Sequence, residues 1–290
     1  MPSTGTPRSK TAGSHFGAFG SYTTWLLLGA PTELSPGYAF GLLMPAMLLG
    51  GVLVSVGTAL AMERFAYRPL RSAPRLAPLI SAIGISIALQ EVVRLFYGRI
   101  PGFPDSRRAI PFPVIDGFTG RSLQLGPVSV QYSALFTLVA LALCTAVLWW
   151  FINRTRMGRA MQATSQDADT SRLMGINVDQ AIFTAFGVGA ALAAVAGMAH
   201  GLRYNNIDFQ MGFLAGLKAF TAAVLGGIGN INGAVVGGLV LGVVEAFATT
   251  YIPGQFGSSA WKDVWAFAIL ILVLVFRPQG LLGTKVVDRA

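Results

Sequence analysis

Four charged residues lie within or beside long apolar runs, and their side chains are the best placed to do chemistry: Glu91, Arg94, Lys218 and Glu245. A charge in such surroundings is costly unless it faces other polar groups or water. Glu91 and Arg94 are three residues apart, a spacing that lets them pair on one face of a helix. Lys218 and Glu245 flank the charge-free run at 219–244, and they could form an ion pair across neighbouring segments or contact a polar solute.

The sequence lacks the constellations that hydrolytic or metal-dependent catalysis requires. There is no H-E-x-x-H, no G-x-S-x-G and no G-x-x-x-x-G-K-[ST] phosphate loop. The two histidines, His15 and His200, are far apart, and Cys144 is the single cysteine. A disulfide framework and a cysteine-built metal site are therefore excluded. We predict no catalytic residue, no metal ligand and no cofactor bound by this chain.

The composition explains why charges are so sparse. Charged residues make up 11% of the 290 residues and hydrophobic residues 53%, whereas a soluble domain carries roughly 25% charged residues. So few charges cannot cover the surface of a water-soluble fold, and such high hydrophobicity excludes a disordered chain. The net charge of +9 comes from basic residues spread between the apolar runs, so nucleic acid is not an expected partner. The composition predicts an all-α, polytopic membrane protein in a lipid bilayer.

Charge-free runs mark the expected membrane segments, because a helix needs about 20 apolar residues to cross the bilayer. We predict about seven segments, one of them a short N-terminal segment at residues 16–30, for which a signal peptide is the alternative. Residues 1–15 are expected to be a disordered tail, residues 16–283 one transmembrane domain and residues 284–290 a cytoplasmic tail. The other apolar runs are 34–62, 76–96, 132–152, 180–202, 219–244, 246–261 and 264–276.

Clusters of basic residues orient these segments, because cytoplasmic loops carry an excess of Lys and Arg. Three dense clusters follow the apolar runs at 34–62, 132–152 and 264–276. Alternate threading places all three in the cytoplasm, provided that residues 209–229 cross the membrane as well. The clusters are Arg64, Arg68, Arg71 and Arg75; Arg154, Arg156, Arg159 and Arg172; and Arg277, Lys285 and Arg289.

Glycine is concentrated in the run at 219–244. Gly229, Gly233 and Gly237 have G-x-x-x-G spacing, which lets helix backbones approach closely in a membrane. Alternatively, residues 222–233 form a broken or re-entrant element that lines a pathway, because so many glycines make a poor continuous helix. The candidate pathway residues are Lys218, Gly226, Gly227, Gly229 and Glu245.

The cytoplasmic connection at residues 153–179 is long for neighbouring helices in a bundle. We predict one short amphipathic helix at residues 157–174, ended by Gly175 in the left-handed conformation. Asp179 is expected to N-cap the following span. The apolar residues of this loop stand among arginines. They could dock into a groove on a partner or lie on the lipid surface, and both interpretations stay open at this point.

Six ordered stretches are specific enough to indicate a family. They are RMGRAM at 156–161, LMGINV at 173–178, GFLAGLKAFTAAVLGGIG at 212–229, ERFAYRPLR at 63–71, LAPLISAIG at 76–84 and FRPQG at 276–280. Together they strongly resemble branched-chain amino acid ABC transporter permeases of the LivH type. The resemblance covers residues 16–283.

This resemblance implies one transmembrane permease subunit of an ABC importer for branched-chain or related small amino acids, in the inner membrane of a bacterium. The implied partners are two cytoplasmic ABC ATPase subunits, which would bind the ATP, a second permease subunit in a heterodimer, and a substrate-binding protein. It also implies that the 153–179 loop couples to the ATPases. The coupling residues would be Arg156, Met157, Gly158, Arg159, Ala160, Met161, Leu173, Gly175 and Ile176.

The sequence departs from the family pattern in a few places. The family's first span has no counterpart, and residues 19–22 resemble the start of its second. Gln162 and Asn232 stand where Arg and Pro are usual. Two alternatives remain beside the importer subunit: a self-contained secondary transporter of small solutes, and a truncated, non-functional permease remnant. A membrane-embedded enzyme would need a cluster of nucleophile, acid and base, which the sequence does not contain.

Overall fold

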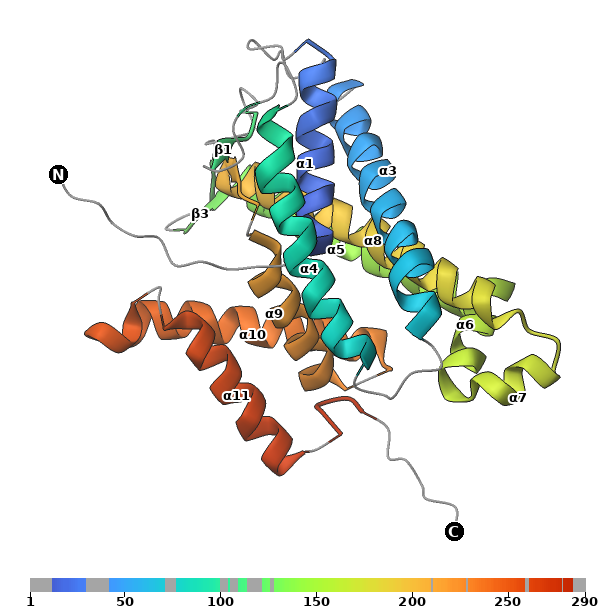
Figure 1. Ribbon diagram of the computed structural model, residues 1–290. Coiled ribbons are helices and arrows are strands. Elements are labelled where there is room, and N and C mark those ends of the chain that lie inside the picture. Colours follow the sequence, from blue (N-terminus) through green and yellow to red (C-terminus); the bar gives the residue numbers. More distant parts are fainter. Residues whose placement is uncertain are drawn as a thin grey trace. The chain divides into compact units, whose positions relative to one another are not determined.

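The computed structural model describes most of the chain. Its residues fall into two compact units, Ser9–Phe213 and Leu214–Ala290 (Figure 1). The predicted disordered tail lies outside the described residues up to residue 11, and a helix begins at Ala12 rather than at residue 16. The predicted cytoplasmic tail, residues 284–290, also lies outside them. The described residues are 12–29, 42–70, 77–99, 104, 109–113, 122–125, 128–209, 211–227, 229–258, 261–277 and 279–283.

The first unit consists mainly of helices, which confirms the predicted all-α class. They are α1 (Ala12–Leu27), α3 (Met44–Met62), α4 (Ala77–Phe96), α5 (Tyr132–Arg154), α6 (Arg156–Gln166), α7 (Ala168–Leu173) and α8 (Val178–Tyr204). A π-helical turn, Glu63–Tyr67, and a 3-10 turn, Arg68–Leu70, extend α3. Two short antiparallel sheets are added: β1 (Ile110–Pro111) with β4 (Asn206–Ile207), and β2 (Ser122–Leu125) with β3 (Val128–Gln131).

Helix α1 packs closely against both α3 and α8 through small residues (Figure 1). A Cβ atom on Gly17 would collide with the backbone of Ala194 in α8. The hydroxyl of Ser55 in α3 donates a hydrogen bond of 2.9 Å to the carbonyl of Ala190 in α8. Because lipid provides no hydrophobic drive between helices, this close backbone approach supplies the van der Waals contact that holds them together.

A hydrophobic core forms where the β1–β4 pairing meets the ends of the helices. Phe112, which follows β1, packs so closely on Gly201 of α8 that a Cβ there would clash with its ring. The N–H of Phe112 also donates to the carbonyl of Asn205, at 3.0 Å. The buried members of this core include Phe19, Tyr22, Leu43, Met47, Ile110, Phe112, Met198, Leu202 and Ile207.

Four helices of the described residues are long and apolar enough to cross a membrane. Two shorter apolar helices, Ala215–Gly226 and Asp263–Phe276, accompany them. The total of about seven membrane segments stays a prediction. The four candidate spans are Met44–Tyr67, Tyr132–Arg154, Val178–Tyr204 and Ile231–Tyr251.

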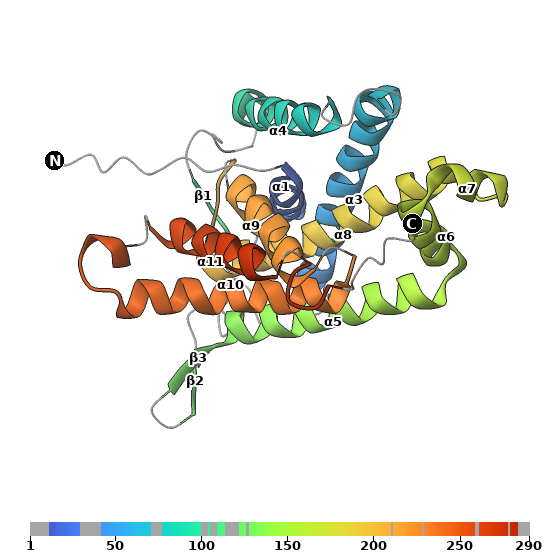
Figure 2. The ribbon, with the colours of Figure 1, turned by 90° about the horizontal axis from the view of Figure 1, so that it is seen from below.

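The second unit contains most of α9 (Met211–Gly226), with α10 (Ile231–Tyr251) and α11 (Lys262–Phe276) (Figure 2). The run at 219–244 is divided, as the alternative of a broken element at 222–233 predicts, because one helix stops after Gly226 and the next starts at Ile231. The prediction of a separate segment at 246–261 is wrong, since α10 runs through Glu245 to Tyr251. A single charge does not end a helix when it finds partners within the protein.

Candidate functional site

The corner between α5 and α6 is tight and depends on one glycine. The hydroxyl of Thr155, the N-cap of α6, accepts a hydrogen bond from the N–H of Gly158 at 3.0 Å. Gly158 is buried, and a Cβ there would collide with the backbone of Phe151 and Ile152 in α5. Glycine at this position therefore fixes the direction in which α6 leaves the membrane helix.

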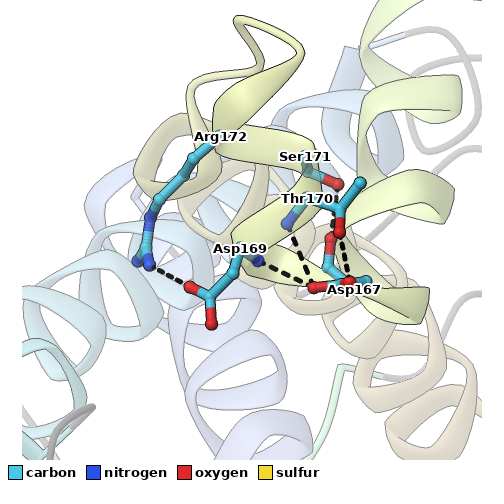
Figure 3. A network of polar contacts seen from close by, with 5 residues as sticks. All are labelled: Asp167, Asp169, Thr170, Ser171 and Arg172. Atoms are coloured by element: carbon cyan, nitrogen blue, oxygen red, sulfur yellow. Dashed lines mark hydrogen bonds and ion pairs between the residues drawn. The ribbon is translucent and has the colours of Figure 1, made fainter.

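The loop contains two helices, so the prediction of one helix at residues 157–174 is wrong. The chain becomes extended at Asp167, where φ is −152°. Its carboxylate accepts hydrogen bonds from the N–H groups of Asp169 and Thr170, at 2.9 and 3.1 Å, and from the Thr170 hydroxyl (Figure 3). An aspartate bonds nearby backbone in this way more readily at an N-cap than inside a helix. Asp167 thus ends α6 and starts α7.

Hydrogen bonds hold the pKa of Asp167 below its ordinary value, first from the Thr170 hydroxyl and then from the N–H groups of Thr170 and Asp169. A carboxyl group whose folded pKa is depressed stabilises the fold above its unfolded pKa, and this stabilisation is lost as the pH falls through the folded pKa. The cap of α7 is therefore complete at neutral pH and weakens only in acid.

We expect the hydrogen-exchange protection of the Asp169 and Thr170 amides, corrected for intrinsic rates, to be constant above about pH 5. It should decrease as the pH falls below the ordinary Asp pKa of about 3.9. Asp167→Ala should lower this protection at every pH, because the cap is gone. Asp167→Asn caps without titrating, so its protection should not depend on pH. Equal pH dependence in Asp167→Asn and the wild type would contradict the assignment.

Helix α7 ends in a Schellman motif. Gly175 has φ +81°, which confirms its predicted left-handed conformation. The N–H of Ile176 donates to the Ser171 carbonyl and the N–H of Gly175 to the Arg172 carbonyl, both at 3.0 Å. An exposed ion pair of 2.9 Å joins Arg172 to Asp169 (Figure 3), and such pairs contribute little stability.

Helix α8 begins two residues earlier than predicted, and its N-cap is Asn177 instead of Asp179. The Asn177 side chain accepts from the N–H of Gln180 at 3.1 Å. Asp179 lies in the first turn and pairs at 3.1 Å with Arg68, which follows α3. The rings of Tyr67 and Phe186 are in contact nearby, 5.2 Å apart. Two of the basic clusters therefore lie at the same end of this unit, as the predicted orientation requires.

We call residues 155–177 the α6–α7 module. It brings together both motifs for which the sequence predicts a coupling role, RMGRAM on α6 and LMGI at the end of α7, and α6 packs on α5, α7 and α8. Leu173 and Met174 are 88% and 79% exposed at its tip. Of the other predicted coupling residues, Arg156, Arg159 and Gly175 are exposed, Met157, Ala160, Met161 and Ile176 are half-buried, and Gly158 is buried.

The charged residues in the apolar helices form pairs. Arg94 contacts Glu91 within α4 at 3.0 Å, as the spacing predicts. In the second unit, Lys218 Nζ lies 2.8 Å from Glu245 Oε1 and 2.7 Å from Asp263 Oδ1. We call Lys218, Glu245 and Asp263 the charged triad. Sequence reasoning missed Asp263, because it stands at the start of α11 beside Lys262 and reads there as an ordinary helix-flanking charge.

The glycines between α9 and α10 allow close helix packing and also break the helix. A Cβ on Gly226 would collide with the backbone of Gly233, so the two helices touch backbone to backbone. The helix is also broken, since Gly227 and Gly229 have φ of +111° and +91°, values that favour glycine. Asn230 then caps α10 by accepting from the N–H of Gly233 at 3.2 Å.

A turn after α11 bonds to the end of α9 at this break. Apart from the FRPQG motif, no sequence pattern predicts this contact. The N–H groups of Leu281 and Leu282 donate to the carbonyls of Leu225 and Gly226, at 2.8 and 2.9 Å. The Asn230 side-chain amide donates to the Leu282 carbonyl at 3.0 Å. The turn thereby satisfies carbonyls at the end of α9 that would otherwise lack partners.

Among the described residues, no three His, Cys, Asp or Glu side chains gather in a way that could hold a metal ion. The three charges of the triad are joined by ion pairs. The arginines of the α6–α7 module are exposed at its surface. Within the described part of the chain, this geometry suits binding and docking.

Comparison with known proteins finds similar transport permeases over most of the chain. The permease protein BraD of the high-affinity branched-chain amino acid transport system of Pseudomonas aeruginosa is 45% identical over 249 residues, covering 86% of this chain and 77% of BraD. The corresponding protein LivH of Salmonella typhimurium is 40% identical over 273 residues, covering 93% of this chain and 84% of LivH. A probable LivH of Methanocaldococcus jannaschii is 26% identical over 281 residues. No solved structure matches the chain.

The family described as "Branched-chain amino acid transport system / permease component" matches residues 12–274. This range includes every membrane helix candidate, the α6–α7 module and the charged triad. The chain is therefore a multi-pass membrane protein and a transport permease rather than an enzyme. It belongs to the family of permease components of branched-chain amino acid transport systems.

Proposed function

We propose that this protein is the transmembrane permease subunit of an ABC importer that carries branched-chain or related small amino acids across the inner membrane of a bacterium. The observation that carries the proposal is its membership of the permease family, together with 45% identity to BraD and 40% identity to LivH. Both relatives are described as parts of high-affinity branched-chain amino acid transport systems.

The α6–α7 module is the proposed contact with the ATPase subunits, which bind and hydrolyse the ATP. Its tip presents Leu173 and Met174 to the surroundings, and exposed apolar side chains of this size favour docking into a groove. A position flat on the lipid surface is less favourable. Helices that lie on lipid combine an apolar face with a polar face rich in Lys and Arg, whereas α7 carries the acidic Asp169 in its first turn after the capping Asp167.

The remaining partners are proposed from the kind of transport system to which the family belongs. They are two cytoplasmic ABC ATPase subunits, a second permease subunit that completes the pathway as a heterodimer, and a substrate-binding protein that delivers the amino acid. The rigid α5–α6 corner supports mechanical coupling, because the buried Gly158 leaves no room for α6 to shift independently of α5.

The break between α9 and α10 is the proposed border of the pathway, with Lys218, Gly226, Gly227, Gly229 and Glu245 along it. Two observations support this. Irregular backbone at membrane depth is stable only where protein or water surrounds it, and the positive φ angles of Gly227 and Gly229 mark such backbone. Charged side chains in apolar helices face the protein interior or a polar cavity, and Lys218 and Glu245 are both about three-quarters buried.

Reconstitution into sealed vesicles tests the proposed function. Vesicles that contain this subunit, the second permease subunit and the ATPases should accumulate leucine only when ATP is inside and loaded binding protein is outside. Loaded binding protein should also stimulate ATP hydrolysis. The control is the same assembly with an ATPase variant that binds but does not hydrolyse ATP, which should give no accumulation. Uptake by this subunit alone, driven by an ion gradient, would establish a secondary transporter and overturn the proposal.

A further inference from the structure

The charged triad carries an unbalanced charge. One ammonium group, that of Lys218, serves two carboxylates, Glu245 at 2.8 Å and Asp263 at 2.7 Å. The triad thus has a formal charge of −1, and its three members come from three different helices, α9, α10 and α11. A single carboxylate would be enough to neutralise the lysine, so the second acidic group leaves these three described side chains with one excess negative charge.

Two members of the triad lie within their helices, and the third, Asp263, lies in the first turn of α11. Glu245 precedes the end of α10 at Tyr251 by about 9 Å of helix, and Lys218 is near the middle of α9. The side chains of Lys218, Glu245 and Asp263 keep 24%, 21% and 22% of their surface exposed. Exposed charge is too costly to face hydrocarbon. The open side of the triad is therefore suited to a polar solute.

We propose that the charged triad is a binding site for the head group of a zwitterionic amino acid on its way through the permease, an inference that rests on the proposed function. The α-ammonium of the solute binds the carboxylates of Glu245 and Asp263, and its α-carboxylate binds the ammonium of Lys218. The empty site has one cation for two anions. The loaded site has two cations for three anions, so every charged group gains or keeps a partner.

The chemistry of the three groups favours this ligand over others. The excess negative charge attracts an ammonium group, and Lys218 provides the opposite pole for a carboxylate on the same molecule. Such a site recognises what all amino acids share and ignores the side chain. It would reject a sugar or a hydroxy acid, which lacks the ammonium, while the choice among amino acids rests with the binding protein.

The rival role is a purely structural clamp that joins the three helices. The double variant Lys218→Glu with Glu245→Lys separates the two roles. It keeps the total charge, and its new lysine can still pair with two carboxylates, so a clamp survives. In this variant, however, the lysine lies on α10 and a glutamate lies on α9. The positions of the positive and negative groups are exchanged, so a head-group site no longer fits the orientation in which the solute is delivered. Asp263→Asn removes the excess charge and leaves the Lys218–Glu245 pair in place.

In the complete reconstituted assembly, we expect both variants to lower leucine uptake per ATP hydrolysed by at least tenfold. Hydrolysis stimulated by loaded binding protein should stay within twofold of wild type, because the α6–α7 module is unchanged. Thr249→Val, one turn from Glu245 on α10, is the matched control and should transport normally. Copurification with the partner subunits checks that each variant folds.

The outcomes distinguish this inference from the proposed function. If the wild-type assembly shows no stimulated hydrolysis, the importer proposal itself fails. If the wild type transports and the charge-swapped variant transports at the same rate, the triad is a clamp and the head-group site is wrong. If the swapped variant does not assemble, Asp263→Asn decides alone: normal uptake per ATP by that variant overturns the site.

Discussion

Arg159→Glu is expected to abolish ATP-driven uptake while the subunit remains folded in the membrane. Arg159 is exposed on α6, so reversing its charge disturbs no packing inside the subunit. A charge reversal at a docking surface places like charges opposite each other and costs several kcal/mol of binding. A loss of about 2 kcal/mol or more corresponds to at least about 30-fold weaker docking. The measurement is leucine uptake by the reconstituted importer, with copurified ATPase as the second readout.

A graded series makes this prediction sharper. Arg159→Lys should keep most of the uptake if charge alone matters and lose more if the planar guanidinium is needed for paired hydrogen bonds. Gln166→Glu, which adds an acidic group at the exposed far end of α6, is the control and should transport nearly as wild type. Normal uptake and normal ATPase retention by Arg159→Glu would show that α6 does not contact the ATPase.

Gly226→Ala is expected to have the second large effect. A Cβ at this position would overlap the carbonyl of Gly233 and approach the Ala234 nitrogen at 2.6 Å. Backbone atoms cannot move aside as a flexible side chain can, so α9 and α10 must separate. Overpacking of this kind costs about 1–3 kcal/mol, which should lower Tm in detergent by about 5 °C. The separated helices also pull on the C-terminal turn that bonds to Leu225 and Gly226, so uptake should fall with stability.

Gly242→Ala provides the matched control for this variant. Gly242 lies in α10, and a Cβ there meets nothing within 4 Å. Alanine is more favourable than glycine in a helix by about 1 kcal/mol, so Tm should stay constant or rise and uptake should be normal. If Gly226→Ala were as stable and active as Gly242→Ala, the close approach of α9 and α10 would not matter for transport.

Local sequence patterns predicted the features that depend on local physics. The scarcity of charge required a membrane environment, and the lengths of the apolar runs located α3, α5 and α8. The i, i+3 spacing of Glu91 and Arg94 was enough to predict their pair, since both residues lie on one helix. Gly175 was predicted as a left-handed helix end because its role depends on the few residues before it.

Local competition between residues explains where those patterns failed. Asp167 interrupts what looked like one amphipathic helix, because its carboxylate bonds the amides that follow it. Asn177 is the N-cap of α8 where Asp179 was expected, and Asp179 pairs with Arg68 instead. Both Asn and Asp are favourable N-cap residues, so the sequence alone does not select between them.

The sequence by itself determined the class of protein, its family and the approximate place of the long helices, because hydrophobicity, charge and ordered motifs are properties of contiguous residues. Only the tertiary structure decided which groups from distant helices meet. Asp263 joins Lys218 and Glu245 through the packing of α9, α10 and α11, and the turn at Leu281 and Leu282 completes the end of α9. Such partners are set by how helices pack, since no short-range periodicity records which charge or carbonyl another segment will reach.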